Sequence, residues 1–398
     1  MATLVRPFRG LRPTPAHAAA VAAPPYDVLN SAEAKAKAAG KPHSFLHISK
    51  PEIDLPNGTD VYSEAVYKKG AENFAAMIAE GVLARDPEPR YYIYRMRMGA
   101  HTQTGLVVAA SVADYDTNRV RKHEFTRPDK EDDRVRQIEA LNAETGPVLL
   151  AYPANTELQR LITSAASTDA DYEVAADNDV THAIWSITDA DTVARITAIF
   201  DAMPALYIAD GHHRSAAASR VAAARRGKSK DDSAEYFLTV AFPHDQMRIL
   251  DYNRVVKDLN GLSADAFMAK VRERFSVSPV QGQARPVRPQ SFGMYIDKHW
   301  YELQIDPKFV PDNDPVAQLD VSLLQNNLIE PVLGIADPRR DKRIDFVGGI
   351  RGLGELEKRV DSGEMAVAFA LHPTRMDQLM AVADANQVMP PKSTWFEP

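Results

Sequence analysis

Hydrophobic and polar residues alternate most regularly over residues 90–98, and this period of two predicts a β-strand. From residue 92 to 98 the even-numbered positions are tyrosine or methionine and share one face. The odd-numbered positions on the other face include two arginines. Residues 99–104 are typical of a turn, and residues 106–112 form a second apolar run. The two runs together predict an antiparallel hairpin.

Most of the remaining N-terminal half consists of short apolar runs, typical of strands, and of segments whose apolar residues recur at helical spacing. Further strands are predicted at 148–152, 182–187, 205–209, 236–242 and 247–252. Helices are predicted at 31–40, 62–84, 157–166, 189–202 and 215–226. The first of these helices has Ser31 as its expected N-cap and Gly40 as its stop.

The C-terminal part repeats the same alternation of helices and strands. Helices are predicted at 264–274, 319–329, 354–361 and 375–385, and strands at 293–304 and 366–371. This mixture indicates an α/β (α+β) fold. A chain of 398 residues exceeds one ordinary core, so we expect two domains, at 1–255 and 256–398.

The composition excludes several classes of protein and of chemical site. The chain has 47 Lys and Arg against 54 Asp and Glu, a net charge of −7, which argues against a general nucleic-acid coat. It contains no cysteine, and this excludes disulfides, thiolate metal sites and cysteine nucleophiles. Its hydrophobic content of 45% is ordinary for a globular protein and excludes a disordered chain.

The N-terminus does not predict export. A basic start is followed by an alanine-rich stretch at 16–23, which contains His17 and ends in Pro24-Pro25. It lacks the leucine-rich core of a signal peptide. No run of about 18 apolar residues occurs, so we expect no membrane span and a cytoplasmic protein.

The richest local pattern is Ile-Ala-Asp-Gly-His-His-Arg-Ser-Ala-Ala over residues 208–217. A buried strand ends, a glycine permits a tight turn, and a helix begins. The free N–H groups and the dipole of a helix start favour an anion. Arg214 can grip phosphate with two parallel hydrogen bonds, and a histidine can hold a proton or a metal. The pattern predicts a phosphate site, with a solvated helix start as the alternative.

A second segment is dense in charge. Residues 119–136 hold 7 Lys or Arg and 5 Asp or Glu in 18 positions. Interleaved charges of this kind suit a phosphorylated, metal-bound ligand. The alternative is a solvated helix face, with Glu131–Arg134 and Asp132–Arg136 as ordinary surface pairs. The residues alone leave both open.

Two proline pairs precede polar residues near the chain ends. Pro24-Pro25 comes before Tyr26 and Asp27, and could present that carboxylate rigidly to a pocket. Pro390-Pro391 comes before Lys392 and two hydroxyl residues, which could contact phosphate. A strand lead-in and a plain terminal tail are the respective alternatives.

Taken together these patterns resemble those of the bacterial and archaeal domain-of-unknown-function family 1015. The resemblance spans nearly the whole chain and rests on residues 24–28, 122–124, 130–134, 209–214 and 389–394, with Thr181-His182, Trp185, Leu324-Gln325 and residues 331–334. The Asp-Gly-His-His-Arg turn is also similar to the phosphate-binding turn of the ParB/sulfiredoxin superfold. That superfold includes nucleotide-binding partition proteins and kinases of free L-serine.

The resemblance implies a mixed sheet core of the ParB/sulfiredoxin type in the first domain, and roles for named residues. Catalytic roles fall to Glu124 as general base, Asp210 and His213. ATP or its phosphates would contact Gly211, His212, Arg214, Arg127, Lys130, Arg134 and Lys392. The small polar substrate would contact Tyr26, Asp27 and Ser393. Mg²⁺ would be held by Asp210 and Glu124. The chain stops at Pro398, where members of the family usually run on a little.

The function that the resemblance implies is transfer of the γ-phosphoryl group of ATP to free L-serine. The first alternative is a nucleotide-binding, ParB-like regulatory or DNA-associated module without kinase activity. The acidic balance and the lack of a basic helix-turn-helix count against nucleic acid as a partner. The second alternative is metal-dependent hydrolysis by His212 and His213, but adjacent histidines point in different directions and seldom share one ion. A homodimer is left open.

Overall fold

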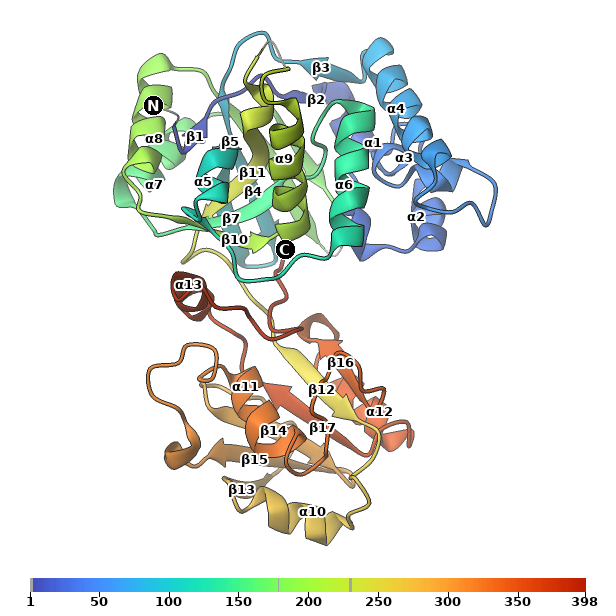
Figure 1. Cartoon of the computed structure of the whole chain (residues 1–398), viewed down its shortest axis with the longest axis vertical. Helices are drawn as coiled ribbons and strands as arrows, with labels where there is room; N and C mark the ends of the chain where they lie inside the picture. Colours follow the sequence, from blue (N-terminus) through green and yellow to red (C-terminus); the bar gives the residue numbers. More distant parts are fainter. Residues whose placement is uncertain (1–2, 178, 229–230) are drawn as a thin grey trace. The chain divides into compact units, whose positions relative to one another are not determined.

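The computed structural model describes residues 3–177, 179–228 and 231–398, and the chain divides into two compact units (Figure 1). One unit comprises Met1–Gln246 with Pro398, and the other comprises Met247–Glu397. Each combines helices with a β-sheet, so the fold is mixed α/β, as the sequence predicts. The boundary expected at residue 255 instead falls within β12 (Tyr252–Val256). That strand pairs with β16 and β17 of the second unit, so the chain enters the second unit earlier.

The first unit is built on a mixed sheet of nine strands within the described residues. Their order is β6-β10-β7-β11-β5-β4-β9-β8, with β1 against β5. The strands are β1 (Val5–Arg6), β4 (Tyr91–Met98), β5 (His101–Ser111), β6 (Val120–Arg121), β7 (Val148–Tyr152), β8 (Tyr172–Ala175), β9 (Val180–Ile187), β10 (Leu206–Asp210) and β11 (Tyr236–Pro243). The pairs β6–β10 and β7–β11 are parallel and the other pairs are antiparallel.

The predicted hairpin is confirmed as β4 and β5, although its turn is shorter than expected because β5 already begins at His101. Alternate residues of the central strands enter the core, and Ile93, Leu106 and Leu150 are fully buried. The helices α7 (Thr156–Ala165) and α8 (Ala190–Asp201) cover part of this core with apolar residues such as Leu158 and Phe200.

A second group of helices surrounds the segments that the sequence analysis singled out. The helix α9 (His212–Arg225) packs against α6 (Pro128–Leu141), and α6 packs against α4 (Glu64–Ala79), as Figure 1 shows. The remaining elements of this unit are α1 (Ala18–Val21), α2 (Ser31–Ala38), α3 (Leu46–Ser49), α5 (Val112–Asp116), β2 (Leu11–Pro13) and β3 (Leu83–Arg85).

Three boundaries differ from the sequence predictions for physical reasons. The N-cap of α2 is Asn30 and not Ser31, because the Asn30 side chain accepts the N–H of Glu33 in a capping box. The helix predicted to reach residue 84 ends at Ala79, since Gly81 takes a φ of +72° and the chain then forms β3 against β2. The strand predicted at 247–252 is wrong except at its last residue, because β12 begins at Tyr252.

The second unit contains an antiparallel sheet of six strands within the described residues, in the order β13-β15-β14-β17-β12-β16. Beside β12 its strands are β13 (Phe275–Val280), β14 (Ser291–Ile296), β15 (His299–Ile305), β16 (Ile344–Gly348) and β17 (Val367–Leu371). Its helices are α10 (Ala264–Val271), α11 (Asp320–Leu324) with a π-helical continuation at Gln325–Ile329, α12 (Gly354–Asp361) and α13 (Met376–Asp384).

Among the described residues, no helix combines the length and the apolar character that crossing a membrane requires.

Candidate functional site

Two parallel strands bring the charge-dense segment and the Asp-Gly-His-His-Arg turn to one edge of the first sheet. Val120 of β6 lies opposite Leu206 of β10, so both chains leave the sheet in the same direction. The chain after β6 forms the loop 122–127, and the chain after β10 turns directly into α9. Such carboxyl ends of parallel strands are where open α/β sheets bind their ligands.

Gly211 is the turn residue between β10 and α9. Its φ of +102° lies in the left-handed region, which glycine adopts without steric cost. The helix begins at His212, three residues before the predicted start, and no side chain caps it. Its first N–H groups and the positive end of its dipole are therefore available to an anion.

Arg214 lies across this turn and is held in place. Its guanidinium donates hydrogen bonds to the carboxylate of Asp210 and to the carbonyl of Pro147. Only 16% of the Arg214 side chain is exposed, whereas 59% of Asp210 is. A Cβ added to Gly211 would lie 3.1 Å from Arg214 Cζ. The glycine thus permits both the turn and the close approach of the guanidinium.

Replacing Gly211 by alanine should therefore have two effects. The left-handed conformation costs about 1–2 kcal/mol for a residue with a Cβ, and the new methyl group also displaces the guanidinium of Arg214. Gly227→Ala is the matched control. Gly227 lies two residues beyond the end of the same helix and also has a positive φ, +72°, but no atom lies within 4 Å of the position that its Cβ would take. Urea titrations should give a larger loss of unfolding free energy for Gly211→Ala. Equal losses would show that the contact with Arg214 does not matter.

His212 fastens the loop 122–127 to the start of α9. Its Nε2 accepts the backbone N–H of His123 at 3.2 Å, and its Nδ1 lies 3.5 Å from a carboxylate oxygen of Glu124. The rings of His123 and His212 meet edge to face with centroids 4.4 Å apart. Both histidines are 3% exposed, and burial lowers the pKa of each. The pair is consequently neutral at physiological pH.

His213 makes a second attachment to the same loop. Its Nε2 accepts the backbone N–H of Arg127 at 3.1 Å, and burial lowers its pKa. The Nε2 atoms of the two adjacent histidines thus accept hydrogen bonds from different backbone amides. Within the described chain, no group of three or more His, Asp or Glu side chains could hold a metal ion. Because each Nε2 atom already accepts a hydrogen bond, this arrangement counts against the metal-dependent hydrolysis by the histidine pair that the sequence left as an alternative.

Asp210 and Glu124, the predicted Mg²⁺ ligands, are both more than half exposed at this edge of the sheet. One or two carboxylates are what a Mg²⁺ ion needs when nucleotide phosphates and water supply the other ligands. The donor set therefore fits a phosphate-bound Mg²⁺ ion, but Asp210 is also paired with Arg214.

Three cations of the charge-dense segment lie at the start of α6 or within it. Arg127 pairs with Asp129 at 2.9 Å and Lys130 Nζ donates to the Tyr62 hydroxyl at 2.8 Å. Arg134 pairs with the neighbouring Asp133 at 2.6 Å. Arg127 is open to a ligand, with 69% of its side chain exposed, whereas only 13% of the Arg134 side chain is exposed.

The surface pairs expected along α6, Glu131–Arg134 and Asp132–Arg136, do not form. Both acidic residues instead pair with Arg220 of α9, at 3.3 and 2.7 Å. Sequence spacing could not reveal this, because the partner lies on another helix.

Tyr26 joins the site from the N-terminal segment. The guanidinium of Arg134 lies 3.9 Å above the centroid of the Tyr26 ring. Burial raises the pKa of the Tyr26 hydroxyl, and the positive charges of Arg134 and Arg214 oppose that rise. Asp27, next along the chain, is exposed in the short 3₁₀ helix Tyr26–Val28. The predicted roles of Tyr26 and Asp27 as substrate contacts stay predictions.

Lys392 and Ser393 belong to the second unit. Lys392 Nζ lies 5.6 Å from the centroid of the Tyr252 ring, and the Ser393 hydroxyl donates to the carbonyl of Pro390 at 2.5 Å. Their predicted contacts with phosphate and substrate stay predictions.

Sequence reasoning missed two groups at this edge. His123 lies within residues 122–124 and no sequence pattern assigns it a role, yet it is buried against His212 and hydrogen-bonded to the backbone of Ile208. Glu144 precedes the Gly146-Pro147 segment that contacts Arg214, and its carboxylate accepts the N–H of Leu238. Removal from water raises the pKa of Glu144 to about 7. No local pattern marks either residue, since the burial comes from other elements.

A family model matches residues 5–322, and its description is "Protein of unknown function (DUF1015)". The chain belongs to this family. The resemblance inferred from the motifs is therefore confirmed at the level of the DUF1015 family, while the ParB/sulfiredoxin likeness stays a prediction. Among proteins with curated functions, none matches this DUF1015 member.

Solved structures similar to this DUF1015 protein include "Free serine kinase in complex with AMP", at 11% identity and a TM-score of 0.35, covering 74% of this chain and 87% of that one. Another is "SbnI with C-terminal truncation from Staphylococcus aureus", at 12% identity and a TM-score of 0.38, covering 73% and 82%. A conserved hypothetical protein from Pyrococcus furiosus gives 12% identity and a TM-score of 0.33, with coverage of 74% and 90%.

Proposed function

We propose that this protein is a small-molecule kinase that transfers the γ-phosphoryl group of ATP to the hydroxyl of free L-serine. The observation that carries the proposal is the uncapped start of α9, across which the guanidinium of Arg214 is held. Phosphoryl transfer needs mainly positioning and electrostatic stabilisation, and this turn offers fixed N–H donors and a fixed cation.

In this proposal Gly211 and the first residues of α9 hold the transferred phosphate through their backbone N–H groups. Arg214 stabilises the charge that develops on it, and Asp210 keeps the guanidinium oriented. His212 and His213 are positioning residues, because their Nε2 atoms hold the loop 122–127 against the turn.

The loop and α6 supply further contacts to the nucleotide. Arg127, Lys130 and Arg134 add positive charge beside the turn, which suits the phosphates of ATP or ADP. Phe125, in the middle of the loop, is 80% exposed, and an exposed ring of this kind can stack on a nucleotide base.

Glu124 is the proposed general base that accepts the proton of the serine hydroxyl. Its carboxylate is 56% exposed and faces Nδ1 of the buried His212 at 3.5 Å, so it is both oriented and accessible. Asp210 and Glu124 would also be the protein ligands of a Mg²⁺ ion, which when bound neutralises the phosphate charge. The proposed contacts to the substrate and the phosphates also include Tyr26, Asp27, Lys392 and Ser393. A homodimer stays a prediction.

The test is to incubate the purified protein with Mg²⁺, ATP and L-serine and to follow O-phosphoserine and ADP by ³¹P NMR. We expect both products in equal amounts. O-Methylserine and L-alanine are the controls, because neither offers a free hydroxyl, and neither should yield a phosphorylated product.

Two other outcomes would contradict the proposal. Binding of ATP without any turnover of serine would favour the nucleotide-binding regulatory module. Turnover of ATP to ADP and inorganic phosphate at the same rate with L-alanine would indicate hydrolysis and not transfer to serine.

A further inference from the structure

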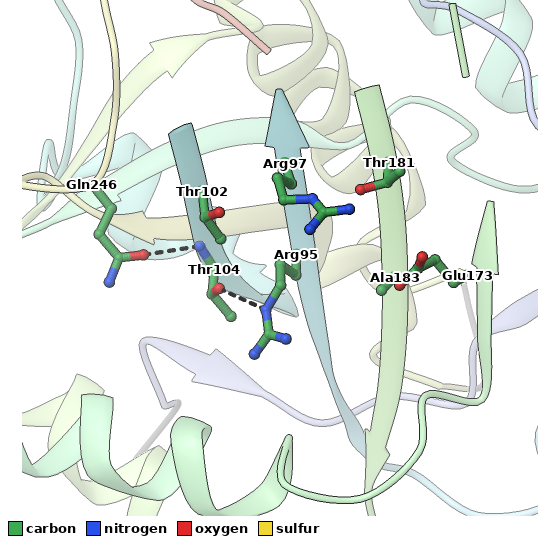
Figure 2. A pocket seen from close by; sticks show the side chains of 8 residues that line it. All are labelled: Arg95, Arg97, Thr102, Thr104, Glu173, Thr181, Ala183 and Gln246. Atoms are coloured by element: carbon green, nitrogen blue, oxygen red, sulfur yellow. Dashed lines mark hydrogen bonds between the residues drawn. The ribbon is translucent and has the colours of Figure 1, made fainter. Parts of the chain in front are cut away.

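A polar cavity lies in the first unit, on one face of the sheet. Its volume is about 690 Å³, within the range of small-molecule sites. It is lined by Arg95, Arg97, Thr102, Thr104, Glu173, Thr181, Ala183 and Gln246. Figure 2 shows that Arg95 and Arg97 stand on β4, flanked by threonines of β5 and by Thr181 of β9.

Within the described residues, neither Arg95 nor Arg97 is paired with a carboxylate. Arg97 is exposed on β4, two residues from Arg95 and on the same face of the strand. Like charges on one face of a strand repel each other, and an anion bound between them would remove that repulsion.

Arg95 is fixed in its place by its neighbours. Its Nε donates to the Thr104 hydroxyl at 3.3 Å, and its guanidinium lies 4.6 Å from the centroid of the Trp185 ring. Thr104 is fixed in turn, because its N–H donates to the side-chain oxygen of Gln246 at 2.9 Å. A cation immobilised in this way loses little entropy when it binds an anion.

The cavity is separate from the turn at Gly211. Asp210 lies opposite Leu149, near the start of β7, whereas Gln246 follows the end of β11. Since β7 and β11 run parallel from Val148 and Thr239 to Tyr152 and Pro243, the two places lie toward opposite ends of these strands.

We propose that this cavity binds a phosphate monoester, as a site distinct from the one at the start of α9. Two guanidinium groups match the double negative charge of a monoester, and the threonine hydroxyls can donate to its remaining oxygens. The volume exceeds what inorganic phosphate fills, so the ligand carries an organic part. Glu173, on the β8 side, can accept a hydrogen bond from a hydroxyl or amino group of that part. This inference does not depend on the proposed kinase activity.

The test is calorimetric titration of the full chain with glycerol 3-phosphate, glucose 6-phosphate and ribose 5-phosphate, each compared with gluconate as a carboxylate. We expect at least one monoester to bind, and Arg97→Gln to weaken that binding by about tenfold or more, since a hydrogen bond to a charged group is lost. Arg97 is exposed, so the variant should fold. Arg85→Gln is the matched control, because Arg85 is also an exposed arginine on a strand of this unit.

Arg214→Lys separates the two sites, and a monoester bound in the cavity should keep its affinity for this variant. The proposal is wrong if no monoester binds, if Arg97→Gln binds as tightly as Arg85→Gln, or if Arg214→Lys loses the binding instead. Gluconate binding as tightly as the monoesters would overturn the assignment to phosphate. None of these outcomes bears on whether serine is phosphorylated, which is measured separately.

Discussion

Replacing Arg214 by lysine should lower kcat/KM for phosphoserine formation by roughly 10²- to 10³-fold, the usual effect of removing one preorganised donor to a transition state. Lysine keeps the positive charge, but it cannot reproduce the planar fork that reaches both Asp210 and Pro147 in this structure. Most of the loss should appear in kcat, because the contact strengthens as charge develops on the transferred phosphoryl group.

Arg225→Lys is the matched control for this measurement. Arg225 lies in the last turn of the same helix, where it donates to Asn142 at 2.7 Å, so the substitution changes the same chemical group at the far end of α9. Its kcat/KM should stay near the wild-type value. An Arg214→Lys enzyme that keeps full activity would remove the turn from the proposed site.

Acidification should destabilise the first unit by about 3 kcal/mol between pH 6.5 and pH 4, through His123 alone. Burial lowers the pKa of this histidine from 6.5 to about 4, so in that interval the unfolded chain binds a proton that the folded chain does not. Stability therefore falls as the pH falls, and the loss is complete below the folded pKa. His212 acts in the same direction, since burial also lowers its pKa.

The measurement is urea unfolding at several pH values, followed by the fluorescence of Trp185. Trp300 and Trp395, both in the second unit, are replaced by phenylalanine so that the signal reports on the first unit. His123→Phe keeps a ring against His212 but cannot titrate, and should remove much of the acid dependence. His299→Phe, at an exposed position of β15, should leave it in place. An unchanged profile in His123→Phe would contradict this account.

The local structure of the candidate site could be predicted from the sequence. Residues 205–217 encode a buried strand, a glycine turn and a helix, because their apolar run, their glycine and their alanine-rich spacing act over a few neighbouring positions. The motifs spread along the chain were also enough to indicate the family, which the family model then established.

Helix ends and one strand were harder to predict, since short-range patterns do not reveal competing partners. The apolar spacing that continues past Ala79 looks helical, but residues 83–85 form a strand because β2 lies beside them. In the same way, Glu131 and Asp132 pair with Arg220, which lies on another helix about 90 residues further along the chain.

By itself, then, the sequence determined the kinds of element, the glycine turn with Arg214 and the family. Only the tertiary structure decided what these residues face. The parallel pairing of β6 with β10 puts His123 against His212, and the hairpin β4–β5 aligned with β9 creates the cavity around Arg95 and Arg97. The physical reason is that burial, charge pairing and pKa depend on atoms close in space, and the pairing of distant strands is what brings those atoms together.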